Sequence, residues 1–156
     1  MKPFENSRAL VLGLVALPLA FGMLGSSCSD SDEADPCDPI LARSVTVEYD
    51  GQEETVELGD LAGELDGERC LVALPAVLQA ADLGIVLAEV AADFRADDGF
   101  QPSSVECAPL DGATLELGHI DRRTGSLVWD PSLGLRGCYS VQKVQAILVE
   151  DASPLP

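Results

Sequence analysis

The stretch VTVEYDGQEETVEL, residues 45–58, sets the fold that the sequence predicts. Apolar and polar residues alternate over residues 45–49 and again over residues 55–58, which is typical of strands with one buried face. Asp50 and Gly51 lie between the two runs, and this pair of residues favours the tight turn of a hairpin. The stretch therefore predicts a β-hairpin, and we expect the domain built on it to be mostly β.

One principal helix is expected after the hairpin, at about residues 75–83. Apolar residues recur at helical spacing from Leu74 to Ala81, Pro75 suits a first turn, and Gly84 can end the helix. Residues 59–69 hold three glycines among acidic residues, so this segment is expected to be a loop with one helical turn begun by Asp60.

The rest of the domain is predicted to be strands and turns. Residues 85–94 alternate as in a strand and also carry a helical stripe, and we favour the strand. A turn is expected at residues 97–99, paired strands at 113–120 and 126–129 around 122–125, and a last strand at 139–150. The expected fold class is α+β: mostly β, with antiparallel hairpins, one principal helix and disulfide staples.

Residues 1–27 have the layout of a secretory signal peptide. Lys2 and Arg8 give a positively charged start, residues 9–24 form an uncharged apolar run, and small residues lead to Cys28. A membrane-spanning helix needs about 20 apolar residues, and this run is shorter and is interrupted by glycine and proline. We therefore expect an exported protein whose signal is cleaved.

The residues Leu24-Gly25-Ser26-Ser27-Cys28 resemble a bacterial lipoprotein signal. The resemblance implies cleavage before Cys28 and attachment of acyl chains, including palmitate, to this cysteine. It departs from the family pattern at Gly25, which stands where a large aliphatic residue is usual. The alternative is ordinary cleavage near Ser27, with Cys28 as a spare thiol. Ser29 after the cysteine favours the outer membrane, so we expect a lipid-anchored protein of the cell envelope.

The chain has five cysteines, and Cys28 as lipid carrier leaves an even set of four: Cys37, Cys70, Cys107 and Cys138. Their spacings do not suit a zinc site, and the single histidine, His119, cannot complete one. Disulfides are the expected role of these four cysteines in an exported protein. Of three possible connectivities, Cys37 to Cys70 and Cys107 to Cys138 close the shorter loops and are the ones we expect.

Charge limits the partners of the chain, because its formal net charge is −18. Such a field repels phosphate backbones, so no nucleic-acid partner is expected, and contact with a membrane is expected only through the lipid. The acidic residues lack the ligand spacing of a calcium loop, and no metal site is expected. We divide the chain into a signal at 1–27, an acidic tether at 28–39, one domain at 40–151 and a tail at 152–156.

A second resemblance spans about residues 45–104. The hairpin, LVALPAVLQAADLG at 71–84 and VAADFRADDGFQPSS at 90–104 are similar, in order and local pattern, to the molybdopterin-binding domain of sulfite-oxidase-type oxidoreductases. In that family a strand leads into an Asp-Gly-aromatic turn, which Asp98-Gly99-Phe100 matches. The family's metal-binding cysteine and its cluster of basic residues have no counterparts here. The resemblance therefore implies a degenerate domain, and we expect no cofactor.

No motif of a nucleophilic, phosphate-binding or metalloprotease enzyme is present, and we expect no enzyme and no catalytic residues. A non-catalytic binding or structural module is the first interpretation, and a degenerate or cryptic molybdopterin-dependent oxidoreductase-like domain is the alternative. The candidate interaction patch consists of Trp129, Pro131, Leu133 and Leu135, which lie in a loop rich in turn residues. Alternatively, Trp129 closes the core. The partner is an unidentified envelope protein or ligand.

Overall fold

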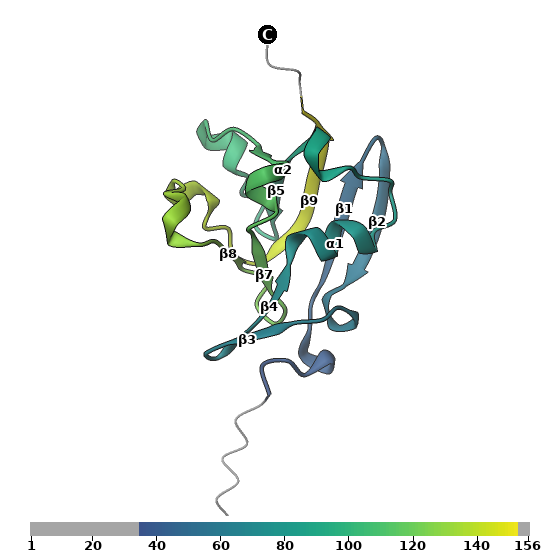
Figure 1. Ribbon diagram of the computed structural model, residues 1–156, viewed down its shortest axis with the longest axis vertical. Coiled ribbons are helices and arrows are strands. Elements are labelled where there is room, and N and C mark those ends of the chain that lie inside the picture. Colours follow the sequence, from purple (N-terminus) through teal and green to yellow (C-terminus); the bar gives the residue numbers. More distant parts are fainter. Residues whose placement is uncertain (1–34, 153–156) are drawn as a thin grey trace, which may run out of the picture. The chain divides into compact units, whose positions relative to one another are not determined.

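A computed structural model describes residues 35–152. Its strands form two sheets (Figure 1). Sheet A has the order β2-β1-β9-β5-β6, with β1 at Ser44–Tyr49, β2 at Gln52–Glu57, β5 at Val90–Ala96, β6 at Leu110–Asp111 and β9 at Val144–Asp151. Sheet B has the order β3-β4-β7-β8, with β3 at Glu64–Asp66, β4 at Arg69–Ala73, β7 at His119–Asp121 and β8 at Leu127–Val128. The expected class, mostly β with one main helix, is confirmed.

The predicted hairpin is present as β1 and β2. The strands are antiparallel, with Val45 opposite Val56 and Tyr49 opposite Gln52. Asp50 and Gly51 have φ values of 50° and 75°, the left-handed backbone that a two-residue hairpin turn requires. The alternation that predicted the hairpin also gives its buried face, because Val45, Val47 and Val56 are all buried.

The neighbour of this hairpin in sheet A was not predicted. β1 pairs in parallel with β9, the last strand, and Val47 lies opposite Ile147. β9 pairs on its other side with β5 in antiparallel fashion, and there Phe94 lies opposite Ile147. Figure 1 shows β9 between β1 and β5. Val47, Ile147 and Phe94 are therefore neighbours on the buried face of the sheet, and each is at most 1% exposed.

Residues 59–69 are not the loop that the sequence predicted. The helical turn is at Leu58–Asp60, and β3 follows and pairs with β4 in a short antiparallel hairpin. Gly67 has a φ of 62° and allows the tight turn. β3 is an exposed edge strand of three residues, so it has no apolar alternation by which sequence could reveal it.

The principal helix, α1, is at Leu74–Ala80. It ends before the expected residue 83, because the backbone of Asp82 adopts a φ of 53° and that of Gly84 a φ of 72°. The strand expected at residues 85–94 is correct only in its second half. Residues Leu87–Glu89 form a 3-10 turn, and β5 begins at Val90. The helical stripe and the strand alternation at 85–94 thus each described part of the segment.

Two further boundaries differ from expectation. The strand expected at 113–120 is a short helix, α2 at Gly112–Leu115, followed by β7. Asp111 begins this helix, because its carboxylate accepts a hydrogen bond from the backbone N–H of Thr114 at 2.8 Å. The last strand starts at Val144 and not at 139, since Tyr139 belongs to the 3-10 turn Gly137–Tyr139.

The core takes side chains from both sheets and from α1. Sheet A contributes the valine, isoleucine and phenylalanine side chains described above, sheet B contributes Val72 and Ile120, and α1 contributes Leu74 and Val77. All four of these last residues are fully buried. Burial of apolar side chains from the two sheets and the helix in one cluster is the main stabilising contribution to this domain.

Gly112→Ala is expected to destabilise the domain strongly. A Cβ on Gly112 would overlap the backbone carbonyl oxygen of Leu87, which cannot rotate away as a side chain does. We expect a loss of about 3 kcal/mol in the free energy of unfolding, measured by urea titration. Gly137→Ala is the matched control, because nothing lies within 4 Å of the added Cβ. Equal stabilities of the two variants would contradict this packing.

A buried arginine holds the place where the chain enters the domain. Arg122 is 7% exposed, and its guanidinium donates to the carbonyl oxygens of Leu58 at 2.9 Å and Cys37 at 2.6 Å. It also donates to the carbonyls of Gly59, at 3.1 Å, and Leu61. One side chain thus satisfies four backbone acceptors, and it joins β7 to the first described residues of the chain.

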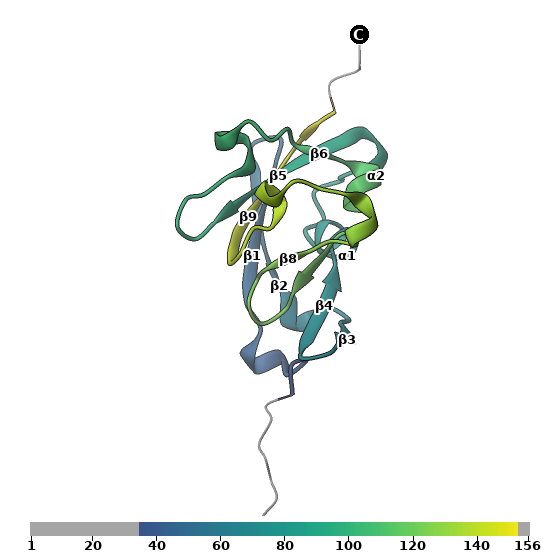
Figure 2. The same cartoon turned by 90° about the vertical axis from the view of Figure 1, so that its left-hand side faces the viewer.

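Cys37 is also bonded covalently to Cys70 in β4. The disulfide and the hydrogen bond from Arg122 therefore fix the chain at the same residue, Cys37. Figures 1 and 2 show that the described chain enters the domain at one end, near β3, and leaves it beyond β9 at the other end.

Candidate functional site

The structure pairs the four cysteines as expected. Cys37 is bonded to Cys70 and Cys107 to Cys138, with sequence separations of 33 and 31 residues. The second disulfide joins Cys107, which follows the 3-10 turn Pro102–Val105, to Cys138 in the 3-10 turn Gly137–Tyr139. Cys28, the predicted lipid attachment site, and the predicted signal lie outside the described residues. The cysteines of the described domain are therefore structural.

Trp129 follows β8 and has two environments. Its indole Nε1 donates to the carbonyl oxygen of Tyr139 at 2.8 Å, and its ring meets Phe94 edge to face, with ring centres 6.0 Å apart. The ring also covers Gly118, where a Cβ would collide with it. Yet the side chain is only half-buried. Trp129 therefore closes the core with one side and leaves another side exposed.

The other members of the predicted patch lie close to it in the chain. Pro131 and Leu133 belong to the 3-10 turn Pro131–Leu133, and Leu135 follows Gly134, whose φ is 59°. Pro131 is exposed, whereas Leu133 and Leu135 are half-buried. Trp129, Pro131 and Leu135 line one hollow of about 330 Å³, and Leu133 is not part of its lining. The structure thus brings three of the four predicted residues together.

We call this depression the Trp129 hollow; it is lined by residues 127–131 and 134–136 together with Arg69 and Ser140. Arg69 comes from β4, and Arg136 lies just before the turn that contains Cys138. The carboxylate of Asp130 accepts a hydrogen bond from the backbone N–H of Ser132 at 2.8 Å. Hydrogen bonding by the Ser132 side chain, and then by this backbone N–H, lowers the pKa of Asp130, so the carboxylate is ionised at neutral pH. The lining therefore carries two guanidiniums and one carboxylate.

Neighbouring hollows share Arg69 but have other charges. One of about 650 Å³ is lined by Glu68, Asp121 and Arg123 in addition to Arg69. Another, of about 620 Å³, contains His119 and Arg69 with three carboxylates: Asp66, Glu116 and Asp130. The second of these also shares Trp129, Asp130 and Pro131 with the Trp129 hollow. The Trp129 hollow differs from both because its lining includes Arg136, a guanidinium in no ion pair among the described residues.

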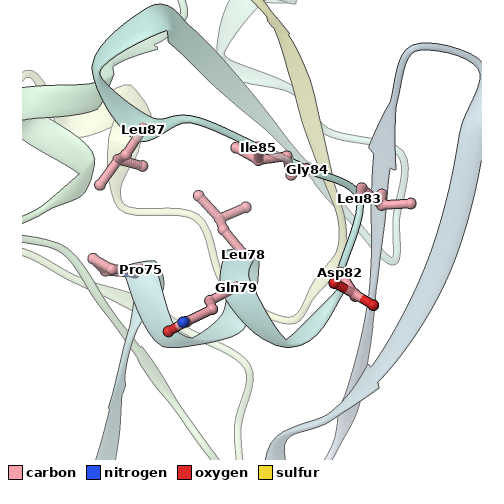
Figure 3. A pocket seen from close by; sticks show the side chains of 8 residues that line it. All are labelled: Pro75, Leu78, Gln79, Asp82, Leu83, Gly84, Ile85 and Leu87. Atoms are coloured by element: carbon pink, nitrogen blue, oxygen red, sulfur yellow. The ribbon is translucent and has the colours of Figure 1, made fainter.

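A further pocket, of about 320 Å³, lies beside α1. In Figure 3, Leu78 of α1 points toward Ile85 and Leu87 on the opposite wall, and the carboxylate of Asp82 points away. Asp82 is the only charged residue of this lining, and Gln79 is its other polar side chain. The pocket is thus a small apolar depression that offers few groups to orient a ligand.

The residues present do not fit a molybdopterin cofactor. Its metal requires a thiolate, and every cysteine of residues 35–152 is in a disulfide. Its phosphate requires converging cations, but Arg122 is buried on carbonyl oxygens and Arg95 is bound to Glu48 at 2.5 Å. Of the two guanidiniums in the Trp129 hollow, Arg69 is bound to Asp66 at 2.6 Å, which leaves Arg136 alone. The turn Asp98-Gly99-Phe100 does follow β5, and the backbone N–H of Phe100 donates to Asp98. That turn is a local feature and supplies no ligands.

Sequence reasoning missed Arg122 as a structural residue and Arg69 and Arg136 as members of one site. Nothing in the sequence separates Arg122 from Arg123, since they are adjacent in a turn. Arg69 and Arg136 are far apart in the chain, and only the pairing of β4 with β7 and of β7 with β8 brings their segments together.

Within residues 35–152, no group of three metal-ligating side chains is close enough to hold an ion. No helix of this described part is long and apolar enough to cross a membrane. Comparisons with protein-family models, with curated proteins and with solved structures find no match for the chain.

Proposed function

We propose that this protein is exported, is anchored to the cell envelope by lipid on Cys28, and acts there as a non-catalytic binding module. The observation that carries the proposal is the pairing of cysteines. Two disulfides use Cys37, Cys70, Cys107 and Cys138, and such bonds persist in oxidising compartments outside the cytosol. Cys28 is the one cysteine outside these four, and it directly follows the signal-like stretch.

The attachment of the domain at Cys37 supports anchoring through a short tether. Eight residues separate Cys28 from Cys37, which gives a reach of about 30 Å when extended. The disulfide to Cys70 and the hydrogen bond from Arg122 to the Cys37 carbonyl fix the end of that tether on the domain. The domain is thereby held close to the membrane, although the chain, with a formal net charge of −18, is repelled by an anionic surface.

The Trp129 hollow supports a binding role. An aromatic face beside proline and leucine, with two guanidiniums at its edge, is a combination that recurs at recognition sites. No hydrogen bond between the described side chains that line it joins a nucleophile to a base, as covalent catalysis requires. Ser29 after the lipid attachment residue supports the outer membrane as the location.

Metabolic labelling with palmitate in the expressing bacterium tests the anchor. We expect label on the wild-type protein and none on Cys28→Ser, because the thiol is the predicted acyl acceptor. Ser31→Ala, a matched change in the tether that keeps the cysteine, is expected to label like the wild type. Unlabelled wild-type protein, or label that persists in Cys28→Ser, would refute the proposal.

A further inference from the structure

The Trp129 hollow differs from the other depressions in charge and in composition. Its lining contains Arg69, Arg136 and one carboxylate, Asp130, whose oxygen is engaged with the Ser132 N–H. Arg69 is paired with Asp66, which lies outside the lining. The pocket beside α1 has one carboxylate and no cation. In a chain of net charge −18, a hollow whose lining offers a guanidinium without an ion pair within residues 35–152, that of Arg136, is complementary to an anionic group.

The two guanidiniums are held in different ways. Arg69 Nη2 is 2.6 Å from a carboxylate oxygen of Asp66, the facing residue of the β3–β4 hairpin, which orients it. Among the described residues, Arg136 is in no ion pair. Its backbone carbonyl accepts a hydrogen bond from Tyr139 N–H at 3.0 Å, and Cys138 nearby is bonded to Cys107. The guanidinium of Arg136 is therefore available to a ligand, and the backbone that carries it is fixed.

The other residues of the lining determine which chemical group the ligand must have besides its negative charge. Trp129 is held in place by its hydrogen bond to Tyr139 and its contact with Phe94, so its exposed side is a rigid apolar wall. Pro131 and Leu135 extend that wall, and Ser140 adds a hydroxyl. A volume of about 330 Å³ suits a small molecule or one terminal residue of a larger one.

We propose that the Trp129 hollow binds a small carboxylate that bears a flat or branched apolar group. The carboxylate pairs with the guanidinium of Arg136, which matches it in two-point geometry. The apolar group lies against Trp129, Pro131 and Leu135. This inference rests on the proposed binding role and names the class of ligand for it.

The emission of Trp129 reports such binding directly, because it is the only tryptophan of the chain. The full-length protein in detergent is titrated with N-acetylphenylalanine, and separately with N-acetylphenylalaninamide, which has the same apolar group and no charge. We expect a saturable change with the carboxylate and at least about tenfold weaker binding of the amide, a difference of about 1.4 kcal/mol.

Arg136→Gln is expected to weaken binding of N-acetylphenylalanine at least about tenfold. Arg123→Gln removes the same charge from the neighbouring hollow and is expected to leave binding unchanged. Unchanged far-ultraviolet circular dichroism and unchanged emission of the free variants show that folding is intact.

Equal binding of the carboxylate and the amide would overturn the inference while leaving a binding role for the hollow. No saturable response to the carboxylate, or equal effects of Arg136→Gln and Arg123→Gln, would also overturn it. Palmitate labelling at Cys28 is independent of all these results, so failure of the ligand class is distinguishable from failure of the anchored module.

Discussion

Reduction of both disulfides is expected to leave the domain unfolded at about 37 °C. The bonds close loops with sequence separations of 33 and 31 residues. Loop-closure entropy assigns about 3.5 kcal/mol to each. Their sum of about 7 kcal/mol is comparable to the whole free energy of unfolding of a small domain, which is about 5–15 kcal/mol. Cys70 and Cys107 are also buried in the core, at 0% and 2% exposure.

Thermal unfolding followed by circular dichroism, with and without a reducing agent, measures this effect. Each bond is also removed alone by replacing both of its cysteines with serine. Each such variant is expected to lose about half of the unfolding free energy that the two disulfides contribute together. Cys28→Ser is the control, because this cysteine is not in either bond. Reduced protein that melts at the same temperature as oxidised protein would contradict a structural role for the bonds.

Arg122→Met is expected to cost at least about 3 kcal/mol of unfolding free energy. The guanidinium donates to four backbone carbonyls, those of Cys37, Leu58, Gly59 and Leu61. Methionine fills similar space and donates no hydrogen bond, so the variant leaves the partly buried carbonyls of Cys37, Gly59 and Leu61 without this donor. That desolvation penalty exceeds the net value of the hydrogen bonds themselves.

Arg123→Met is the matched control, since Arg123 is the exposed neighbour in the same turn. A change within about 0.5 kcal/mol is expected for it. Urea titration of both variants gives the difference. If Arg122→Met and Arg123→Met unfold at the same urea concentration, the guanidinium does not stabilise the domain.

The features that sequence predicted correctly are local. The β1–β2 hairpin follows from alternation and an Asp-Gly turn, and α1 follows from a helical stripe behind Pro75. Its end was placed late because left-handed backbone at Asp82 has no strong sequence signal. Local patterns thus give the type of an element more reliably than its limits.

The features that sequence missed depend on distant partners. The parallel pairing of β1 with β9 joins residues about a hundred positions apart, and strand alternation contains no information about direction or neighbour. β3 is stable only because β4 lies beside it. Arg122 and Arg123 are chemically identical, and the fold alone makes one buried and the other exposed.

The candidate site was found in part. Trp129, Pro131 and Leu135 do line one hollow, as a bulky aromatic residue in a turn suggests. The two alternatives for Trp129, core or surface, are both realised in one side chain. The positive charges of the hollow come from β4 and from the segment before Cys138, which the sequence separates by more than sixty residues, so no pattern could join them.

The mass of the intact protein, purified from the membranes of its own cells without reduction, tests the central proposal most directly. The proposal predicts a chain that starts at Cys28, carries acyl groups on that residue, and is four hydrogens lighter than the reduced form because of two disulfides. A chain that starts at any other residue, or one that lacks acyl groups and has free cysteines, would contradict the proposal.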